Sequence, residues 1–368
     1  MPLLSPPLLL IRKRYALPHG NILYLPLREM RVGTSPNLLS NGDMEAGTTG
    51  WTGSRLTAIS ETTIIHGGAK SLKLVANDVG GAGAARAINA LSSYANYLGI
   101  TYTLTGWGRA TSGNTYTQAM SLANQSSHTY SSDFPKDDTF AQYTVTRKST
   151  SADTSFGVGA FVKKESDADT DDTAYFDDMV LTVPQMRSPN GVIVHPEGCV
   201  HNANGFLFDG TDDLITLESD IIGTSACTII AWIYPTGWGE GSLGRICDNG
   251  KTSFMVRNLD PNLATMAIYS NGVNNLKAPN GSIALNTWFR VAATRIADGT
   301  AAIYINGTSV ANGASGAPVA GDNQLCIGNN LAGSATFAGT IDDVQVYNRV
   351  LSATEIMADF TANRGAHL

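Results

Sequence analysis

The acidic residues are the first candidates for chemistry, because glycoside hydrolysis uses two carboxyl groups held at a fixed separation. Glu165 and Asp167 lie in an acidic stretch without the further glutamate that would complete such a pair, and Asp342 with Asp343 has no third acid nearby in the sequence. The motifs of serine hydrolases, zinc proteases and phosphate-binding loops are absent, and the six histidines are scattered. We therefore predict no catalytic residues and a protein that is not an enzyme.

Two tryptophans are candidates for sugar binding, since sugar sites combine an aromatic face with a few amide or charged groups. Trp107 and Arg109 lie on one side of a predicted strand, opposite Leu104. Trp238 lies in the glycine-rich loop 236–242, where we expect it to be exposed. We predict Trp107, Arg109 and Trp238 as glycan-binding candidates, and for Trp107 the alternative is packing in a core.

Composition limits the classes of protein to consider. The chain has 368 residues, enough for two or three domains, with 43% hydrophobic and 15% charged residues, 38 glycines and a net charge of −7. This indicates a globular protein with many turns, and the weak negative charge argues against nucleic acid as a partner. No run approaches the roughly 20 apolar residues of a membrane-spanning helix, so we expect no membrane insertion.

The four cysteines form no C-x-x-C pair, so the usual spacing of zinc ligands is absent. Cys227 and Cys326 lie in strand-like runs, where a free cysteine behaves as a small apolar residue. The sequence leaves two alternatives open, which are buried free thiols and one disulfide.

Residues 1–19 are predicted to form an extended, apolar and proline-rich arm. Pro2, Pro6 and Pro7 disfavour both a helix and a central strand. The basic residues 12–14 follow the apolar run instead of preceding it, so we expect no secretion signal. The arm either folds onto its own domain or docks on a neighbouring subunit.

Most of the remaining chain alternates short apolar runs with Gly, Ser, Thr and Asn, which is typical of all-β sandwiches. The pair Asn306-Gly307 between alternating residues predicts a hairpin turn. Ser352 and Glu355 form a capping box that begins a short C-terminal helix, and we expect Gly365 to end it.

Residues 37–183 contain the motifs of one known sandwich, which are Asn37-Leu-Leu, Asn41-Gly-Asp-Met-Glu45, Gly50-Trp51, His66-Gly-Gly-Ala-Lys-Ser-Leu-Lys-Leu74 and Tyr175-Phe-Asp-Asp-Met-Val-Leu181. Together they resemble a carbohydrate-binding-module jelly roll of the galactose-binding-like type. The resemblance implies a structural calcium held by Glu45 and Asp177, since hard oxygen ligands suit Ca²⁺. The same two carboxylates also fit a turn cap and a solvated strand end.

A second group of motifs closely resembles the concanavalin A-like, laminin-G-like jelly roll. These motifs are Phe208-Asp-Gly-Thr-Asp-Asp213, Ile230-Ala-Trp-Ile-Tyr-Pro235, Trp288-Phe-Arg-Val-Ala-Ala-Thr294, Ile303-Tyr-Ile-Asn-Gly307 and Gly339-Thr-Ile-Asp-Asp-Val-Gln-Val-Tyr-Asn-Arg349. The resemblance implies that Asp342 helps to bind a structural calcium. Trp51 and Trp288 occupy motif positions that pack the fold in relatives. We therefore expect an all-β chain of two β-sandwich jelly rolls with a short C-terminal helix and an extended N-terminal arm.

The order of these motifs predicts an interrupted domain. In the laminin-G-like family a strand like Leu23-Tyr-Leu-Pro-Leu27 is followed closely by a Ser-Pro-Asn-Gly turn, which here comes only at residues 188–191. We predict a discontinuous jelly roll of residues 20–36 and 184–368, with the carbohydrate-module-like domain of residues 37–183 inserted. Pro26 requires the first strand to lie at a sheet edge or to end there. The alternative is two domains in tandem with an independent arm.

The two resemblances also suggest where the protein works. Laminin-G-like and carbohydrate-module-like domains are familiar on phage tails, fibres and capsid decorations, and a phage protein needs no secretion signal. We expect a virion structural protein, a capsid decoration, head fibre or tail component, that assembles in the host cytoplasm and is extracellular when released. Residues 1–19 would dock a homo-oligomer to other virion subunits, and the β-domains would meet host-surface polysaccharide. The alternative is a secreted or cell-surface carbohydrate-binding adhesin or accessory module.

Overall fold

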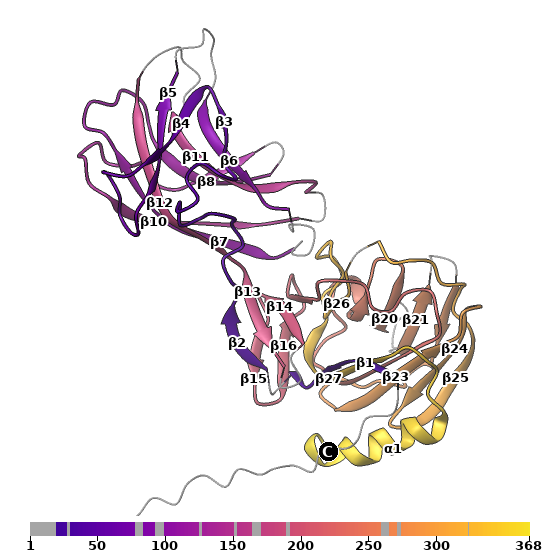
Figure 1. Ribbon diagram of the computed structural model, residues 1–368. Coiled ribbons are helices and arrows are strands. Elements are labelled where there is room, and N and C mark those ends of the chain that lie inside the picture. Colours follow the sequence, from indigo (N-terminus) through magenta and orange to yellow (C-terminus); the bar gives the residue numbers. More distant parts are fainter. Residues whose placement is uncertain are drawn as a thin grey trace, which may run out of the picture.

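The computed structural model describes residues 20–27, 30–77, 84–92, 99–124, 127–150, 153–163, 171–188, 192–258, 265–270, 274–322 and 324–368. The predicted arm and the stretch with Glu165 and Asp167 lie outside these residues. The fold is nearly all-β, with two sandwiches of antiparallel strands and one α-helix (Figure 1). The predicted fold class is thus confirmed. In the described part of the chain, no helix has the length and apolar character to cross a membrane.

The first sandwich consists of two five-stranded sheets. One has the order β10-β7-β12-β5-β4, with β4 (Leu56–Glu61), β5 (Ser71–Ala76), β7 (Thr101–Ala110), β10 (Ala141–Lys148) and β12 (Thr173–Thr182). The other has the order β3-β6-β11-β8-β9, with β3 (Thr52–Ser54), β6 (Ala85–Ala90), β8 (Ala119–Asn124), β9 (His128–Tyr130) and β11 (Phe156–Lys163). The core between them contains Trp51, as the sequence predicts.

The second sandwich consists of an eight-stranded and a nine-stranded sheet. The first has the order β15-β16-β27-β18-β23-β24-β25, with β1 also on β27; its strands are β1 (Asn21–Leu25), β15 (Val200–Asn202), β16 (Gly205–Asp209), β18 (Cys227–Pro235), β23 (Phe289–Arg295), β24 (Thr300–Ile305), β25 (Thr308–Ala314) and β27 (Ala338–Tyr347). The second has the order β2-β13-β14-β17-β26-β19-β20-β21-β22; its strands are β2 (Arg31–Thr34), β13 (Pro184–Arg187), β14 (Ile193–Glu197), β17 (Leu214–Thr216), β19 (Arg245–Asp248), β20 (Thr252–Arg257), β21 (Thr265–Ser270), β22 (Asn274–Lys277) and β26 (Cys326–Ile327). A short 3₁₀ turn, η3 (Glu240–Ser242), precedes β19.

Strands β1 and β2 belong to the second sandwich although they precede the first sandwich in sequence. β1 pairs with β27, and Leu23, Leu25 and Leu27 are buried in the core that the two large sheets share. β1 ends immediately before Pro26, as the missing N–H of proline requires. β2 pairs with β13 so that Thr34 lies opposite Pro184. The chain therefore leaves and re-enters the second sandwich at neighbouring points, which supports the proposed insertion of residues 37–183.

The motif of residues 206–217 forms two strands joined by a short connection, and these strands lie in different sheets. β16 pairs with β15 and β27 in one sheet, whereas β17 pairs with β14 and β26 in the other. The connection therefore crosses from one layer to the next. Asp213 stabilises it by accepting a hydrogen bond from the Asp209 backbone N–H at 2.7 Å. Local turn signals cannot distinguish this crossing from a hairpin, because the sheet partners are distant in sequence.

Two predicted local features are confirmed and one is wrong. Asn306 and Gly307 join β24 to β25 with φ of 50° and 80°, the left-handed values that this hairpin turn needs. Helix α1 (Ala353–Asn363) begins with the Ser352–Glu355 capping box. Gly365 does not end the helix, because the chain continues into the 3₁₀ turn η4 (Arg364–Ala366).

All four cysteines are free in the structure. Cys227, Cys247 and Cys326 are buried, and burial raises the pKa of each thiol above its usual range. These side chains therefore stay protonated and pack as small apolar residues, in agreement with the free-thiol alternative.

The two sandwiches meet along a seam beside β7 and β14 (Figure 1). The Glu197 carboxylate of β14 accepts hydrogen bonds from the backbone N–H of Thr101 at 2.9 Å and from its hydroxyl at 2.5 Å. Lys148 of β10 approaches the same carboxylate at 3.9 Å. A cleft of about 250 Å³ opens here, lined by residues of both sandwiches. The seam therefore includes polar contacts between the sandwiches, beside the apolar side chains of Leu214 and Leu331 that line the cleft.

A shortened chain tests the proposed insertion. Residues 35–183 would be replaced by Asn-Gly, because paired residues Thr34 and Pro184 are joined most simply by a two-residue hairpin turn. We expect this chain to fold with the core of the second sandwich intact. The fragment 184–368 should be less stable by several kcal/mol, since it loses the buried leucines of β1 at about 1.5–3 kcal/mol each.

Urea unfolding of the two proteins provides the measurement. A fragment 184–368 as stable as the shortened chain would contradict the insertion and favour domains in tandem.

Candidate functional site

The outer face of the sheet β10-β7-β12-β5-β4 carries the predicted residues Trp107 and Arg109. Along β7 the side chains alternate between buried and half-buried, with Tyr102 and Leu104 in the core. Trp107 and Arg109 therefore lie together on the outer face. The strand register places Gln142 of β10 beside Trp107 and Tyr175 of β12 beside Arg109.

Trp107 forms an aromatic stack with a residue that the sequence analysis does not single out as a binding candidate. The His66 ring lies parallel to Trp107, with ring centroids 3.8 Å apart and an interplanar angle of 15°. Phe140 approaches the same imidazole edge-on at 5.8 Å. Nδ1 of His66 lies 2.9 Å from Oδ2 of Asp178, which fixes the ring over the indole. The half-buried Trp107 is thus part of a surface cluster and not of the core.

Arg109 is held in place by a carboxylate and an aromatic ring. Its Nε donates to the Asp138 backbone carbonyl at 2.6 Å, and its Nη2 lies 3.0 Å from the Asp138 carboxylate. The guanidinium lies 5.0 Å from the centroid of Tyr175, which Lys73 also approaches at 5.7 Å. Nη1 of Arg109 is buried and has no hydrogen-bond partner among the described residues. The carboxylate and the ring therefore hold Arg109 in one orientation on the same face as Trp107.

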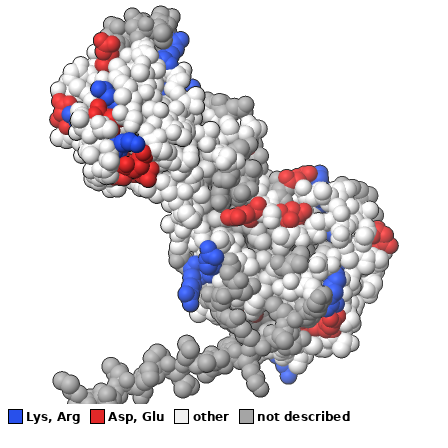
Figure 2. Space-filling view, in the orientation of Figure 1, with Lys and Arg blue, Asp and Glu red and all other residues white. Residues whose placement is uncertain are grey.

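Charge is sparse on the visible surface of the molecule. Figure 2 shows Lys, Arg, Asp and Glu in small separate groups, with uncharged side chains between them, over the described residues on that side. A neutral or weakly charged ligand suits such a surface better than a polyanion does.

Trp238 differs from the prediction. The side chain is only partly exposed, because it packs against the core of the second sandwich. Its loop is folded back by a hydrogen bond from Gly244 N–H to the Trp238 carbonyl at 3.1 Å. The glycines of the loop therefore permit tight turns and do not project the indole into solvent.

Glu45 and Asp177 both bind the loop 66–70 through hydrogen bonds. Glu45 accepts from the N–H groups of Ala69 and Lys70, at 2.7 and 3.1 Å. The buried Asp177 accepts from the N–H groups of His66 and Gly67, at 2.9 and 3.1 Å. The hydrogen bonds lower the pKa of Glu45, whereas burial raises that of Asp177. This arrangement supports the turn-cap alternative, and calcium at Glu45 and Asp177 stays a prediction.

Replacing Asp177 by alanine is expected to lower the free energy of unfolding of the first sandwich by about 1–3 kcal/mol, because the N–H groups of His66 and Gly67 lose their acceptor. Urea unfolding in EDTA and in excess Ca²⁺ should give the same loss. A loss that occurs only with Ca²⁺ present would assign this carboxylate to a metal.

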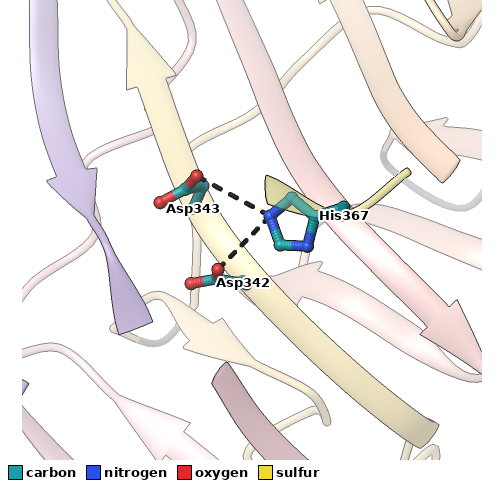
Figure 3. Close-up of side chains that lie close together, drawn as sticks. All are labelled: Asp342, Asp343 and His367. Atoms are coloured by element: carbon teal, nitrogen blue, oxygen red, sulfur yellow. Dashed lines mark ion pairs between the residues drawn. The ribbon is translucent and has the colours of Figure 1, made fainter. Parts of the chain in front are cut away.

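Asp342, the third metal candidate, lies in a different kind of cluster. It is fully buried on β27, next to Asp343 and close to the imidazole of His367 (Figure 3). Trp288, predicted to pack in the fold, is half-buried and lies against the same imidazole, with ring centroids 4.4 Å apart. The sequence does not connect His367 to this site, because His367 lies 24 positions after Asp343.

Comparisons with known proteins agree with the fold of the second sandwich. Residues 209–357 match the family model described as the concanavalin A-like lectin/glucanases superfamily, of the laminin G type. The match covers 149 of the 368 residues and lies within the second sandwich. No curated protein matches the chain.

Solved structures give more distant similarities. A heptameric pentraxin from Limulus polyphemus is 17% identical, with a TM-score of 0.31, 36% of this chain covered and 68% of that chain. Domain 4 of an extracellular arabinanase from Geobacillus stearothermophilus, in complex with arabinotriose, is 16% identical, with a TM-score of 0.36 and coverage of 45% and 80%. The binding domain of botulinum neurotoxin serotype D is 16% identical, with a TM-score of 0.37 and coverage of 48% of each chain. At such values these similarities assign no function.

Proposed function

We propose, from the similarity of residues 209–357 to the concanavalin A-like lectin/glucanases superfamily, that the protein is a non-catalytic structural component of a phage particle. It would be a capsid decoration, head fibre or tail component. The outer face of β10-β7-β12-β5-β4 would bind host-surface glycans. The observation that carries the glycan-binding part of this proposal is the His66–Trp107 stack, with Arg109 on the same sheet face.

The chemistry of that face suits a sugar. A pyranose ring has an apolar face that packs on aromatic rings, and its hydroxyls need a few fixed donors and acceptors. The His66–Trp107 stack supplies the aromatic surface. Arg109 and Gln142 lie on neighbouring strands beside it and supply hydrogen-bonding groups, and Asp138 and Tyr175 hold Arg109 in position. A pre-ordered site of this kind loses little side-chain entropy on binding.

The position of the first described residue supports attachment through residues 1–19. Gly20 lies beside Asn348, whose N–H donates to the Gly20 carbonyl at 3.0 Å. β1 therefore starts at the side of the second sandwich near α1, whereas the first sandwich lies at the other end of the molecule (Figure 1). An arm that docks a homo-oligomer to other virion subunits would leave the first sandwich directed outward.

Deleting residues 1–19 from the chain tests whether these residues attach the protein to the phage particle. We expect the shortened protein to fold and to be missing from purified particles, as measured by mass spectrometry of the virion. Incorporation at the normal copy number would refute the docking role of the arm.

The alternative function is a secreted or cell-surface carbohydrate-binding adhesin or accessory module. The observation that favours it is the similarity of residues 209–357 to the lectin/glucanases superfamily. An adhesin needs only a carbohydrate-binding fold, whereas the phage component also needs a particle. A cell-fractionation experiment separates the two. Protein found on the cell surface without any phage particle would favour the adhesin, and protein found only in particles would favour the virion component.

A further inference from the structure

The outer face of strands β15 and β16 carries an exposed apolar pair at one edge of the eight-stranded sheet. Phe206 and Phe208 of β16 are buried in the core, so Leu207 between them points outward. Val200 of β15 lies directly opposite Leu207 in the strand register. Val200 is 57% and Leu207 39% exposed, whereas α1 packs on β18, β23 and β24 of the same face. The apolar pair is therefore open to solvent.

Three carboxylates follow this apolar pair. Asp209 comes two residues after Leu207 in β16, so it points to the same face, and Asp212 and Asp213 follow in the connection to β17. Their carboxylate oxygens lie within 4.8 Å of one another. Asp209 and Asp212 are exposed and form no ion pair with the residues that the structure describes. Burial raises the pKa of Asp213, and the negative charges of Asp209 and Asp212 raise it further, although Lys148 opposes this. Positive charge brought to these carboxylates would therefore be favourable.

β15 is the outermost strand at its end of the sheet. Val200–Asn202 pair with β16 on one side, and no described strand pairs with them on the other. An edge strand leaves backbone N–H and C=O groups on its free side, which can pair with an added extended segment. The β15 edge therefore suits a peptide whose apolar residues are followed by basic ones.

Residues 8–14 of this chain have that composition. The apolar run Leu8-Leu-Leu-Ile11 is followed directly by Arg12-Lys-Arg14, and no proline interrupts either run. The backbone N–H groups that strand pairing needs are therefore present, unlike at the prolines that precede residue 8. This segment lies outside the described residues, so its partner is argued from the surface that would receive it.

The position of the carboxylates sets the direction of an added strand. Gly198, two residues before Val200, lies against the carboxylate of Asp213. β15 therefore runs away from the carboxylates. A segment that proceeds from apolar to basic residues places its basic end at the carboxylates only if it runs antiparallel to β15. Antiparallel pairing is also the commoner arrangement.

The basic residues of the same chain cannot reach these carboxylates. Asn21 lies opposite Tyr347 of β27, and Asp209 lies opposite Ala338, nine positions away along the same strand. Nine positions correspond to about 30 Å at roughly 3.3 Å per residue. Arg14 comes seven residues before Asn21, which allows at most about 25 Å of extended chain. Moreover, β1 and β16 run in the same direction, so the arm leaves β1 away from β16 and a return would need a turn. The segment must come from a second copy.

We propose that residues 8–14 of one copy add as an antiparallel strand to β15 of a neighbouring copy. Leu8–Ile11 would cover Val200 and Leu207, and the basic residues would meet the carboxylates of Asp209 and Asp212. The donor segment and the receiving edge are different surfaces, so the contact is head-to-tail and builds a ring or a chain of copies. The inference builds on the docking role proposed for residues 1–19 but not on the phage particle, because it concerns copies of this chain alone.

Sedimentation velocity of the purified full chain in EDTA, over a range of concentrations, tests the interface. We expect the full chain to associate and the chain without residues 1–19 to stay monomeric. Leu207→Asn should weaken association by about tenfold or more, because it places an amide in the apolar contact. Ile296→Asn is the matched control, since Ile296 is similarly exposed, at 41%, but lies between β23 and β24. It should associate as the unchanged chain does.

A mixing experiment identifies the donor and the receiving surface separately. The Leu207→Asn chain keeps its arm, and the chain without residues 1–19 keeps its β15 edge. Neither should associate alone, and together they should form a complex that stops at one copy of each. Reversing the charges of Arg12, Lys13 and Arg14 to Glu should abolish this complex, and adding Asp209→Lys with Asp212→Lys to the receiving chain should restore it.

Circular dichroism shows whether each variant folds. The proposal fails if the full chain is monomeric at every concentration, if the chain without residues 1–19 associates as the full chain does, or if folded Leu207→Asn and Ile296→Asn associate equally. Association that requires added Ca²⁺ would assign the carboxylates to a metal and also overturn it. Incorporation into particles is a separate measurement, so a failure of this interface is distinguishable from a failure of the proposed virion role.

Discussion

Replacing Arg290 by methionine is expected to lower the free energy of unfolding of the second sandwich by about 3–5 kcal/mol, because it leaves a buried carboxylate without its counter-charge. Arg290 is 1% and Asp359 0% exposed, and their side chains meet through two contacts, at 2.7 and 3.1 Å. Burial by itself lowers the pKa of the Arg290 guanidinium, but the attraction of Asp359 outweighs it and the net pKa is raised. The pair joins α1 to β23, so its loss should weaken the packing of α1 against the sheet.

A surface pair provides the control. Arg349 and Glu355 are each 32% exposed, and Arg349→Met should change the free energy of unfolding by about 1 kcal/mol or less, because solvent screens exposed pairs. Urea unfolding of both variants gives the comparison. Adding Asp359→Asn to Arg290→Met should restore part of the loss. An Arg290→Met variant within about 1 kcal/mol of the unchanged chain would contradict the role of this pair.

Replacing Trp107 by alanine is expected to weaken glycan binding by about tenfold or more, equivalent to about 1.4 kcal/mol or more. The indole supports the His66 ring at 3.8 Å, so its loss removes one aromatic surface and releases the other. The ligand would be the strongest one on an array of bacterial surface polysaccharides, and titration calorimetry would give the affinities. The melting temperature of the first sandwich checks that the variant is folded.

Trp238→Ala is the matched control, since this indole packs against the core of the other sandwich. It should leave glycan affinity within about twofold, while Trp107→Phe should retain part of the binding. If Trp107→Ala bound the glycan as tightly as the unchanged chain, the glycan site would not lie on this sheet face. A loss with Trp238→Ala alone would place it in the second sandwich.

The sequence predicts the elements of this fold better than the partners of each element. Short-range signals such as Asn306-Gly307 and the Ser352–Glu355 capping box depend on residues close in the chain, and both are confirmed. The sequence does not show that the two strands around residues 210–213 lie in different sheets, because they pair with β27 and β26, more than 100 residues away. Residues close to a strand in the sequence therefore do not indicate a strand partner that lies so far along the chain.

The candidate sites show the same limit. Alternation along β7 is sufficient to place Trp107 and Arg109 on one face. The stacking of His66 on Trp107 and the approach of His367 to Asp343 depend on loops that return to a distant strand, at a bulge that no residue pattern identifies. The repeated Asp-Asp pair in β12 and β27 is visible in the sequence, and a histidine opposite each pair could have been sought only once the fold was known.

The crystal structure of the full chain with its best array oligosaccharide tests the central proposal most directly. We predict a sugar ring packed against the His66–Trp107 stack, with hydroxyls hydrogen-bonded to Arg109 or Gln142. An oligosaccharide bound at the Trp238 loop or elsewhere on the second sandwich would contradict the proposed site, as would an array without any bound glycan.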